Sequence, residues 1–483
     1  MNRLSLYVVA AVLVSWSAGN LIKSAVAAEP SPRPNIVVFL ADDLGYADVP
    51  WHGTKYSMPN LDALAKQSLR LEAHYVNPMC SPTRAAFLSG RYASRFGVTG
   101  AQNERAYPFD QATLASVLKG AGYATALTGK WHLGSKSEWG PNKFGFDHAY
   151  GSLAGGVGPY DHHYKKGEYT ETWHRNGELI TEEGHVTDLV AREAVAFVDK
   201  QSATKPFFLY IPFTAVHIPI DEPAEWLERN LHVEDEGERL HAACASHMDD
   251  AVGRVLAALE RAKLRDNTIV MFFSDNGGHQ VIGNADPKYP GTYPEKKVGG
   301  HNTPLRGYKG QLYEGGVRSA TLVSWPGMIQ PGRKSDVPVH VTDWLPTFAV
   351  LAGYRPDGAA REKLRWDGTD LAALLFTDSS AVAAPPRGEI YCLGVGGRNS
   401  LLRQGDWKLI IGERGDAELY NLAADVGEKT NIAAQEPQRV AAMSAALQAA
   451  AKADYDRMTP ETAGKTKNAP PKKSPPQPII GKR

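Results

Sequence analysis

The sequence predicts an α/β fold that is followed by a smaller C-terminal α+β subdomain. Continuous apolar runs at 35–40 and 268–273 are typical of strands buried on both faces of a sheet. Amphipathic segments at 186–200 and 241–264 alternate with such runs and predict helices that cover the sheet. Acidic residues follow both apolar runs closely, at the strand ends where α/β sheets place their ligands.

Further elements continue this alternation along the chain. We expect helices at 59–74 (capped by Asn60), 113–122 and 343–352, and strands at 123–127, 206–212 and 319–325. Two stretches, 144–177 and 279–300, are rich in glycine and aromatic residues, and we expect them to be long loops near the strand ends.

The expected domain boundaries are a main domain at 33–380, a small C-terminal subdomain at 386–458 and a disordered tail at 459–483. Pro385 and Pro386 mark the linker between the two domains. The subdomain should hold four short strands and a helix, at 388–393, 401–404, 407–412, 417–420 and 438–455. The tail is rich in proline and lysine, a composition that cannot form a packed core.

Residues 1–27 have the features of a secretory signal. Arg3 is followed by an apolar run at 4–16, and Ala25-Val26-Ala27 fits a cleavage site. The run is shorter than the roughly 18 residues that a membrane span requires, although an uncleaved anchor is the alternative. We therefore expect an exported protein, periplasmic or secreted, with no stable membrane insertion after cleavage.

Charge and cysteine content limit the other classes of function. Basic and acidic residues number 53 each, so the net charge is zero and indicates no nucleic-acid partner. The three cysteines are Cys80, Cys244 and Cys392. We expect the last two to be buried thiols rather than a disulfide, because they fall in different domains.

Cys80 lies at the centre of the most informative segment, 79–92. Pro82 favours a first helical turn, the residues after it are apolar, and Gly90 fits a helix end. Cys80 would then lie at a helix N-terminus, where backbone N–H groups favour an anion, and Arg84 would add positive charge one turn later. The alternative is an inert, buried cysteine before a core helix.

Two polar pairs predict a metal site. Asp42 and Asp43 follow one buried strand, and Asp275 and Asn276 follow another. Adjacent carboxylates repel each other unless a cation holds them, and hard oxygen ligands suit Ca²⁺ or Mg²⁺. A solvated turn is the alternative for either pair taken alone.

Two further positions combine charge with a titratable ring. Lys130 and His132 are two residues apart after a short strand, so both should project to one side and could hold an anion and move a proton. His217 follows another strand and would otherwise be interpreted as a structural histidine.

Four sequence blocks together resemble the type I sulfatases, and most closely the arylsulfatase B-like branch that includes N-acetylgalactosamine-4-sulfatase. The blocks are Cys-Ser-Pro-Thr-Arg at 80–84, Gly-Lys-Trp-His-Leu-Gly at 129–134, His-Ile-Pro at 217–219 and the stretch 301–310, which contains Lys309. The resemblance implies an alkaline phosphatase-like sandwich with a large mixed central sheet flanked by helices. It also implies a sulfuric ester hydrolase that acts on sulfated carbohydrates such as galactose or N-acetylgalactosamine units.

The resemblance further implies that a formylglycine-generating enzyme converts Cys80 to 3-oxoalanine (formylglycine). The hydrated aldehyde would attack sulfur, Arg84, Lys130 and Lys309 would hold the sulfate, His217 or Lys309 would protonate the leaving alcohol, and His132 would take a proton. The Ca²⁺ ligands would be Asp42, Asp43, Cys80, Asp275 and Asn276.

The two loops supply the residues that we expect to bind the sugar. Aromatic and polar side chains there offer stacking faces and hydrogen bonds, and the candidates are Tyr160, His162, His163, Trp173 and His301. The alternative is that the loops merely cover the domain. Two other functions remain open: a phosphomonoester or phosphonate hydrolase of the same superfamily, and a non-catalytic sugar-binding relative.

Overall fold

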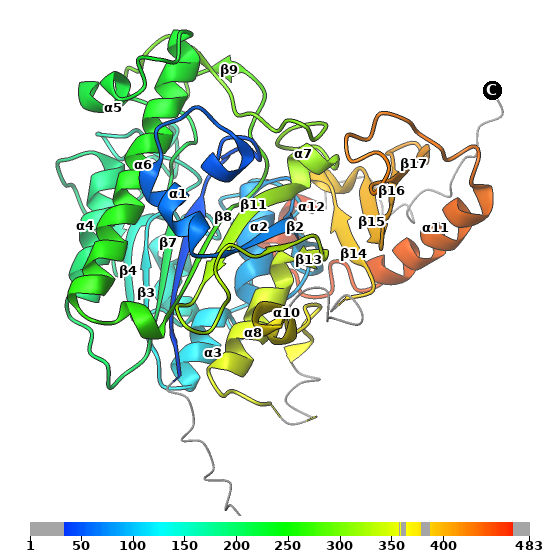
Figure 1. Ribbon diagram of the computed structural model, residues 1–483, viewed down its shortest axis with the longest axis horizontal. Coiled ribbons are helices and arrows are strands. Elements are labelled where there is room, and N and C mark those ends of the chain that lie inside the picture. The colour runs from blue at the N-terminus through cyan, green and yellow to red at the C-terminus, as the bar shows by residue number, and fades with distance from the viewer. Residues whose placement is uncertain (1–32, 357, 359–363, 378–386, 467–483) are drawn as a thin grey trace, which may run out of the picture. The chain divides into compact units, whose positions relative to one another are not determined.

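A central sheet of eleven strands forms the body of the protein in the computed structural model, which describes residues 33–356, 358, 364–377 and 387–466 (Figure 1). Its strands are β1 Asn35–Ala41, β2 Leu69–Tyr75, β3 Ala124–Thr128, β4 His148–Ser152, β5 Trp173–Arg175, β6 Glu178–Leu179, β7 Phe207–Pro212, β8 Thr268–Ser274, β11 Arg318–Ser324, β12 Lys334–Ser335 and β13 Val339–His340. The order is β12-β2-β11-β8-β1-β7-β3-β4-β5-β6, and β13 pairs with β2. The predicted signal at 1–27 lies outside the described residues.

Five neighbouring strands, β8, β1, β7, β3 and β4, run parallel. Their carboxyl ends therefore meet at one edge, which places side chains from distant parts of the sequence together. The strand β11 runs antiparallel to both β8 and β2, so the sheet is mixed, as expected.

Helices pack on both faces of this sheet because its strands are apolar on both sides. Val37 and Phe39 of β1 join one buried cluster, whereas Ile36 and Val38 join the other. Each fully buried apolar side chain of this size contributes roughly 1.5–3 kcal/mol. The helices that contribute to the first cluster are α1 Pro59–Lys66, α4 Val186–Val198 and α6 Glu236–Arg261; those of the second are α2 Cys80–Ser89, α3 Leu114–Gly120, α8 Trp344–Leu351 and α10 Ala372–Phe376.

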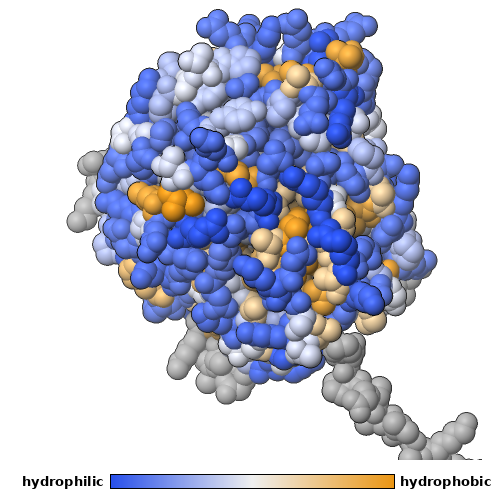
Figure 2. Space-filling model, turned by 90° about the vertical axis from the view of Figure 1, so that its left-hand side faces the viewer, coloured by the Kyte–Doolittle hydropathy of each residue, from blue (hydrophilic) through white to orange (hydrophobic). Residues whose placement is uncertain are grey.

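The outer surface is largely polar. Figure 2 shows a mostly hydrophilic face on which apolar residues form small, separate groups. Such scattered groups do not indicate a hydrophobic docking surface on this face. Among the described residues, no helix combines the length and the hydropathy that crossing a bilayer requires.

The predicted C-terminal subdomain is confirmed as a four-stranded antiparallel sheet with one long helix. Its elements are β14 Ile390–Leu393, β15 Ser400–Gln404, β16 Trp407–Ile411, β17 Ala417–Asn421 and α11 Pro437–Ala451. The buried Lys408 ammonium lies 2.8 Å from carboxylate oxygens of both Glu314 and Glu428. Glu314 belongs to α7 Glu314–Val317, so this ion pair connects the small sheet to the main body. The predicted linker at Pro385 and Pro386 lies outside the described residues.

Two expectations are wrong in detail. The helix predicted at 59–74 ends at Lys66, and Leu69–Tyr75 forms β2, because apolar Leu69 and Leu71 alternate with polar Arg70 and Glu72. Period-two alternation of this kind is typical of a strand. Asn60 does not cap α1, since Met58 occupies the N-cap position.

The predicted disordered tail is also wrong in its first part. Pro460–Thr466 forms α12. The Thr459 hydroxyl donates a 3.0 Å hydrogen bond to the Arg105 carbonyl, and Glu461 lies 3.0 Å from the Arg105 guanidinium. These contacts attach the segment to the main body, and residues 467–483 lie outside the described residues.

A buried cluster of histidine and acidic side chains connects α4 to α6. The Nδ1 of His247 lies 2.8 Å from Glu222, and its Nε2 lies 3.4 Å from Asp188. Burial opposes a charge on His247, but Asp188 and Glu222 together raise its pKa to about 9. Nδ1 of His185 accepts a hydrogen bond from the Thr187 N–H, which directs its Nε2–H toward Glu222. Nε2 of His185 and Nε2 of His247 still lack a hydrogen-bond partner among the described residues, so ion pairs with Glu222 and Asp188 hold the cluster together.

We predict that His247→Gln flattens the pH dependence of stability between pH 6.5 and 9. A folded-state pKa raised from 6.5 to about 9 contributes stability that is fully present below pH 6.5 and is lost as pH rises through 9, at most roughly 3 kcal/mol. Urea unfolding at pH 6 to 9 measures this slope. The exposed His232 provides the control variant, His232→Gln, which should keep the wild-type slope. An unchanged slope in His247→Gln would refute the ion-pair role.

Candidate active site

The acidic residues predicted to bind metal meet at the carboxyl edge of the parallel strands. Asp42 and Asp43 follow β1, and Asp275 follows β8. Backbone hydrogen bonds hold these segments together: the Asp275 N–H donates to Ala41 O at 3.1 Å, and the Asp42 N–H donates to Ala215 O at 2.9 Å. Asp42, Asp43, Asp275 and Asn276 are all buried. The structure thus brings together four oxygen-bearing side chains from two strands.

Cys80 is the first residue of α2, as predicted, and Gly90 ends that helix in the left-handed conformation, at φ 66°. The Cys80 sulfur and one carboxylate oxygen each of Asp42 and Asp275 lie within 4.8 Å of one another. One turn later, Arg84 is fully buried and donates two hydrogen bonds to Asp275 Oδ2, at 3.0 and 2.8 Å. The helix N-terminus therefore places a thiol and a guanidinium beside the carboxylates.

The remaining predicted catalytic residues surround the same group. The Lys130 ammonium forms an ion pair with Asp42, and the Lys309 ammonium lies 2.7 Å from Asp43 Oδ2. Nε2 of His217 lies 3.8 Å from the same Asp43 oxygen. His132 is buried beneath the backbone of Gly155, where any side chain would collide with its imidazole. All six predicted catalytic residues thus border one site.

Burial and charge set the protonation of these groups. Burial raises the pKa of the Cys80 thiol, and burial with the positive charge of Lys130 holds the pKa of His132 well below its usual range. Burial and Lys309 lower the pKa of His217 to about 4. Burial opposes ionisation of Asp43, yet Lys309 and His217 hold its pKa below the usual range. The histidines are therefore neutral and Asp43 is ionised at neutral pH.

Unpaired oxygens at this edge fit a bound cation. Asp42 Oδ1 and Asn276 Oδ1 are buried and have no hydrogen-bond partner among the described residues. Burial and the negative charge of Asp42 raise the pKa of Asp275, even though Arg84 donates to its carboxylate. Carboxylate and amide oxygens are the ligands that Ca²⁺ and Mg²⁺ take in proteins. The residues present therefore fit a hard divalent cation.

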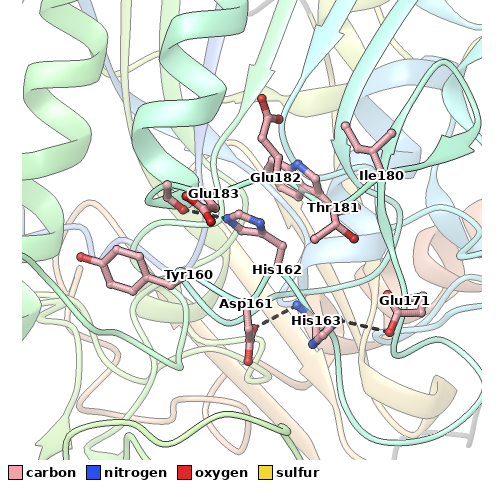
Figure 3. A pocket seen from close by; sticks show the side chains of 11 residues that line it. Tyr160, Asp161, His162, His163, Glu171, Ile180, Thr181, Glu182 and Glu183 are labelled. Atoms are coloured by element: carbon pink, nitrogen blue, oxygen red, sulfur yellow. Dashed lines mark hydrogen bonds and ion pairs between the residues drawn. The ribbon is translucent and has the colours of Figure 1, made fainter.

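Four of the five residues predicted to bind sugar line a separate pocket of about 430 Å³ (Figure 3). Tyr160 is 47% exposed, but Trp173 is only 3% exposed and stacks on His162 at 4.7 Å between ring centroids. Trp173 is therefore almost fully buried, and its stacking on His162 leaves little of its ring for a sugar. His163 pairs with Glu171 at 3.1 Å. The wall also carries Asp161, Glu182 and Glu183, so the pocket is acidic.

His301 lies apart from this pocket. Its Nδ1 is 3.0 Å from Asp48 and 3.1 Å from the Tyr56 hydroxyl, and the raised pKa of His301 follows from the hydrogen bond to Asp48. The structure therefore does not join the five predicted residues into one sugar site. A role for His301 in orienting the segment that leads to Lys309 is the simpler interpretation.

Sequence reasoning missed a group of three residues, one of which, Tyr289, lies near the predicted catalytic His217. Tyr164, Lys165 and Tyr289 come from the two loops, and Lys165 lies over both tyrosine rings at 5.9 and 5.6 Å. The sequence does indicate that the 279–300 segment lies near the site, because this segment directly precedes the block containing Lys309. It does not indicate which aromatic residues of the segment face the site, because that depends on how the loops pack.

Comparison with known proteins agrees with this geometry. Residues 34–354 match the family model described as Sulfatase. The chain is 34% identical to mouse arylsulfatase J over 70% of its length and 55% of that protein, and 34% identical to pig N-acetylgalactosamine-6-sulfatase over 68% and 63%. Its fold also matches the crystal structure of Ps i-CgsB in complex with k-i-k-neocarrahexaose, with a TM-score of 0.76, 29% identity and coverage of 90% and 96%.

The chain thus spans less than two thirds of the length of these two mammalian relatives. The family match nevertheless covers the strand ends, α2 and Lys309, which together form the site described above. The resemblance found in the four sequence blocks is therefore confirmed, and the chain belongs to the sulfatase family.

Proposed function

We propose that this protein hydrolyses sulfate esters of carbohydrates, with galactose or N-acetylgalactosamine units of a polysaccharide as the substrate class. The observation that carries the proposal is the convergence of Cys80, buried carboxylates, three cations and two neutral histidines at one sheet edge. The candidate signal at 1–27 supports export to the periplasm or the medium, where such polysaccharides occur.

Asp42, Asp43, Asp275, Asn276 and residue 80 would hold Ca²⁺, with Mg²⁺ as an alternative. When bound, the cation would add positive charge against the sulfate oxygens. The unpaired oxygens of Asp42 and Asn276 support this assignment. We assign the ion here rather than to the cluster of His185, Glu222 and His247, because two of the three donors in that cluster are imidazole nitrogens, whereas Ca²⁺ and Mg²⁺ take oxygen ligands.

Residue 80 would act after conversion of Cys80 to formylglycine by a formylglycine-generating enzyme, and it would then supply a hydrated aldehyde as the nucleophile. Its place at the N-terminus of α2 supports this role, because backbone N–H groups there stabilise negative charge. Cys244 and Cys392, the other two cysteines, are buried free thiols, as expected.

The other side chains would bind the sulfate and move protons. Arg84, Lys130 and Lys309 would hold its oxygens, exchanging part of their present contacts with carboxylates for contacts with the ester. His217 or Lys309 would give a proton to the leaving alcohol. His132, a neutral imidazole, would accept the proton that is released when sulfate leaves.

The carbohydrate class is supported by two of the similar proteins. One is named for N-acetylgalactosamine 6-sulfate, and the other was crystallised with a neocarrahexaose. A steroid sulfate is the second candidate, because the chain is 31% identical to mouse steryl-sulfatase over 76% of its length and 70% of that protein. The phosphate-ester and non-catalytic alternatives remain as outcomes of the same test.

We predict that the protein cleaves sulfated galactose or N-acetylgalactosamine oligosaccharides with a larger kcat/KM than aryl, steroid or phosphate esters. Sulfate release from a panel of these esters measures the ranking. Cys80→Ala should abolish every activity in the panel, because no other residue there can provide the aldehyde. The control is Cys392→Ser, a change at a buried thiol of the small sheet, and this variant should keep the wild-type activities.

A preference for steroid or phosphate esters would overturn the carbohydrate assignment. Undiminished activity of Cys80→Ala would overturn the proposed chemistry itself, whatever the substrate.

We predict that Asp275→Asn weakens Ca²⁺ binding to the metal-stripped protein at least about tenfold, because one anionic ligand is lost. Titration calorimetry reads out binding without requiring catalysis. The matched variant Glu222→Gln alters the other buried histidine and acid cluster, and it should bind Ca²⁺ like the wild type. The reverse result, weaker Ca²⁺ binding in Glu222→Gln alone, would place the ion in the cluster of His185, Glu222 and His247 and would contradict the proposed site.

A further inference from the structure

Two loops that are far apart in sequence meet beside the catalytic histidines. The backbone N–H of Lys166 donates a 2.7 Å hydrogen bond to Lys288 O, and the Tyr293 hydroxyl donates a 3.2 Å hydrogen bond to Asp161. These contacts hold the 155–170 loop against the 284–293 segment. A surface built from both loops therefore adjoins the site.

Tyr289 lies next to His217 across this junction. A Cβ placed on Gly156 would be 2.8 Å from the Tyr289 hydroxyl and 3.4 Å from Nδ1 of His217, so the two groups lie close together on the same side of the loop backbone. The Tyr289 hydroxyl is buried and has no hydrogen-bond partner among the described residues. An unsatisfied buried hydroxyl is costly, which indicates a group that gains its partner from a bound molecule.

Lys165 extends the same surface with a positive charge. Its ammonium lies 5.6 Å from the Tyr289 ring centroid and forms one ion pair, with Asp286 at 3.7 Å. Tyr164 and Tyr289 pack edge to face at 6.0 Å. The side chain of Lys165 is 34% exposed. Its ammonium is thus held over aromatic rings with capacity left to bind an anion.

This surface and the catalytic cations face a common region. His217 and Lys309 have the most exposed side chains of the catalytic group, at 16% and 14%, so substrate reaches the site on their side. Burial and the positive charges of Lys288 and Lys309 lower the pKa of Lys165, whereas the negative charge of Asp286 raises it.

We propose that Lys165 and the Tyr289 hydroxyl form an accessory site for a second anionic group, a sulfate or a carboxylate, on the sugar that carries the scissile ester or on its neighbour. This inference rests on the proposed carbohydrate sulfatase function and narrows its substrate class to glycans with at least two negative groups. The acidic pocket around Tyr160 would repel such a chain, so the glycan extends past Lys165 instead.

The test compares three oligosaccharide probes that share one cleavable sulfate. The first has no other charge, the second has an additional sulfate, and the third has a uronic carboxylate. For the wild type we expect the two dianionic probes to have a lower KM than the first probe. Lys165→Met should raise the KM of the dianionic probe that the wild type binds better, by about tenfold more than it raises the KM of the first probe. Lys165→Arg should bring the KM of that dianionic probe most of the way back to the wild-type value. The probe that loses more identifies the anion.

Two further variants separate binding from general disruption. Lys166→Met changes the neighbouring lysine, whose ammonium donates to the Pro287 carbonyl, and should leave all three KM values unchanged. Tyr289→Phe should raise KM without lowering the unfolding midpoint, because it removes a buried hydroxyl that has no partner. Salt near 1 M should shrink the effect of Lys165→Met, since screening weakens an ionic contact.

Equal KM values for the three probes in the wild type, or equal losses for them in Lys165→Met, would overturn the accessory site while leaving sulfate-ester hydrolysis intact. No sulfate release from any probe by the wild type would instead overturn the proposed function. The two failures are therefore distinguishable.

Discussion

The site depends on one constraint, the burial of three carboxylates at the carboxyl edge of the parallel strands. Removing an ionised carboxylate from water costs several kcal/mol unless positive charge and hydrogen bonds compensate it. The structure compensates with cations from three separate segments, namely Arg84, Lys130 and Lys309. Two oxygens, on Asp42 and Asn276, remain unpaired even so. The excess of oxygen ligands that makes the edge costly to bury suits a divalent cation, and the three cations suit an anionic ester.

The central sheet and the catalytic group could be predicted because their determinants are local. A buried apolar run followed by a polar pair specifies a strand and its functional end, and the parallel order then brings Asp42 and Asp275 together. The segment at 69–75 was misinterpreted because Pro59 begins a real helix just before it, and the helical pattern was extended across Leu69 and Leu71. The helix Pro460–Thr466 was missed because composition does not report its contacts with Arg105.

The sugar-binding residues could not be predicted in the same way. Composition marks aromatic residues as candidates, but it does not show which ones are buried: Trp173 stacks within the core, whereas Tyr289 and Lys165 adjoin the catalytic groups. That difference follows from how two loops, more than a hundred residues apart, pack against each other. The proposed specificity therefore depends on how the two loops pack, whereas the chemistry proposed for the sheet edge depends on short motifs.

The mass of the tryptic peptide 71–84, which contains residue 80, tests the central claim most directly. In active protein, made together with a formylglycine-generating enzyme, this peptide should lack one sulfur and two hydrogens and gain one oxygen relative to the cysteine form. The share of converted peptide should rise in proportion to sulfate-ester hydrolysis across preparations. A fully active preparation whose peptide retains the unmodified cysteine would contradict the account.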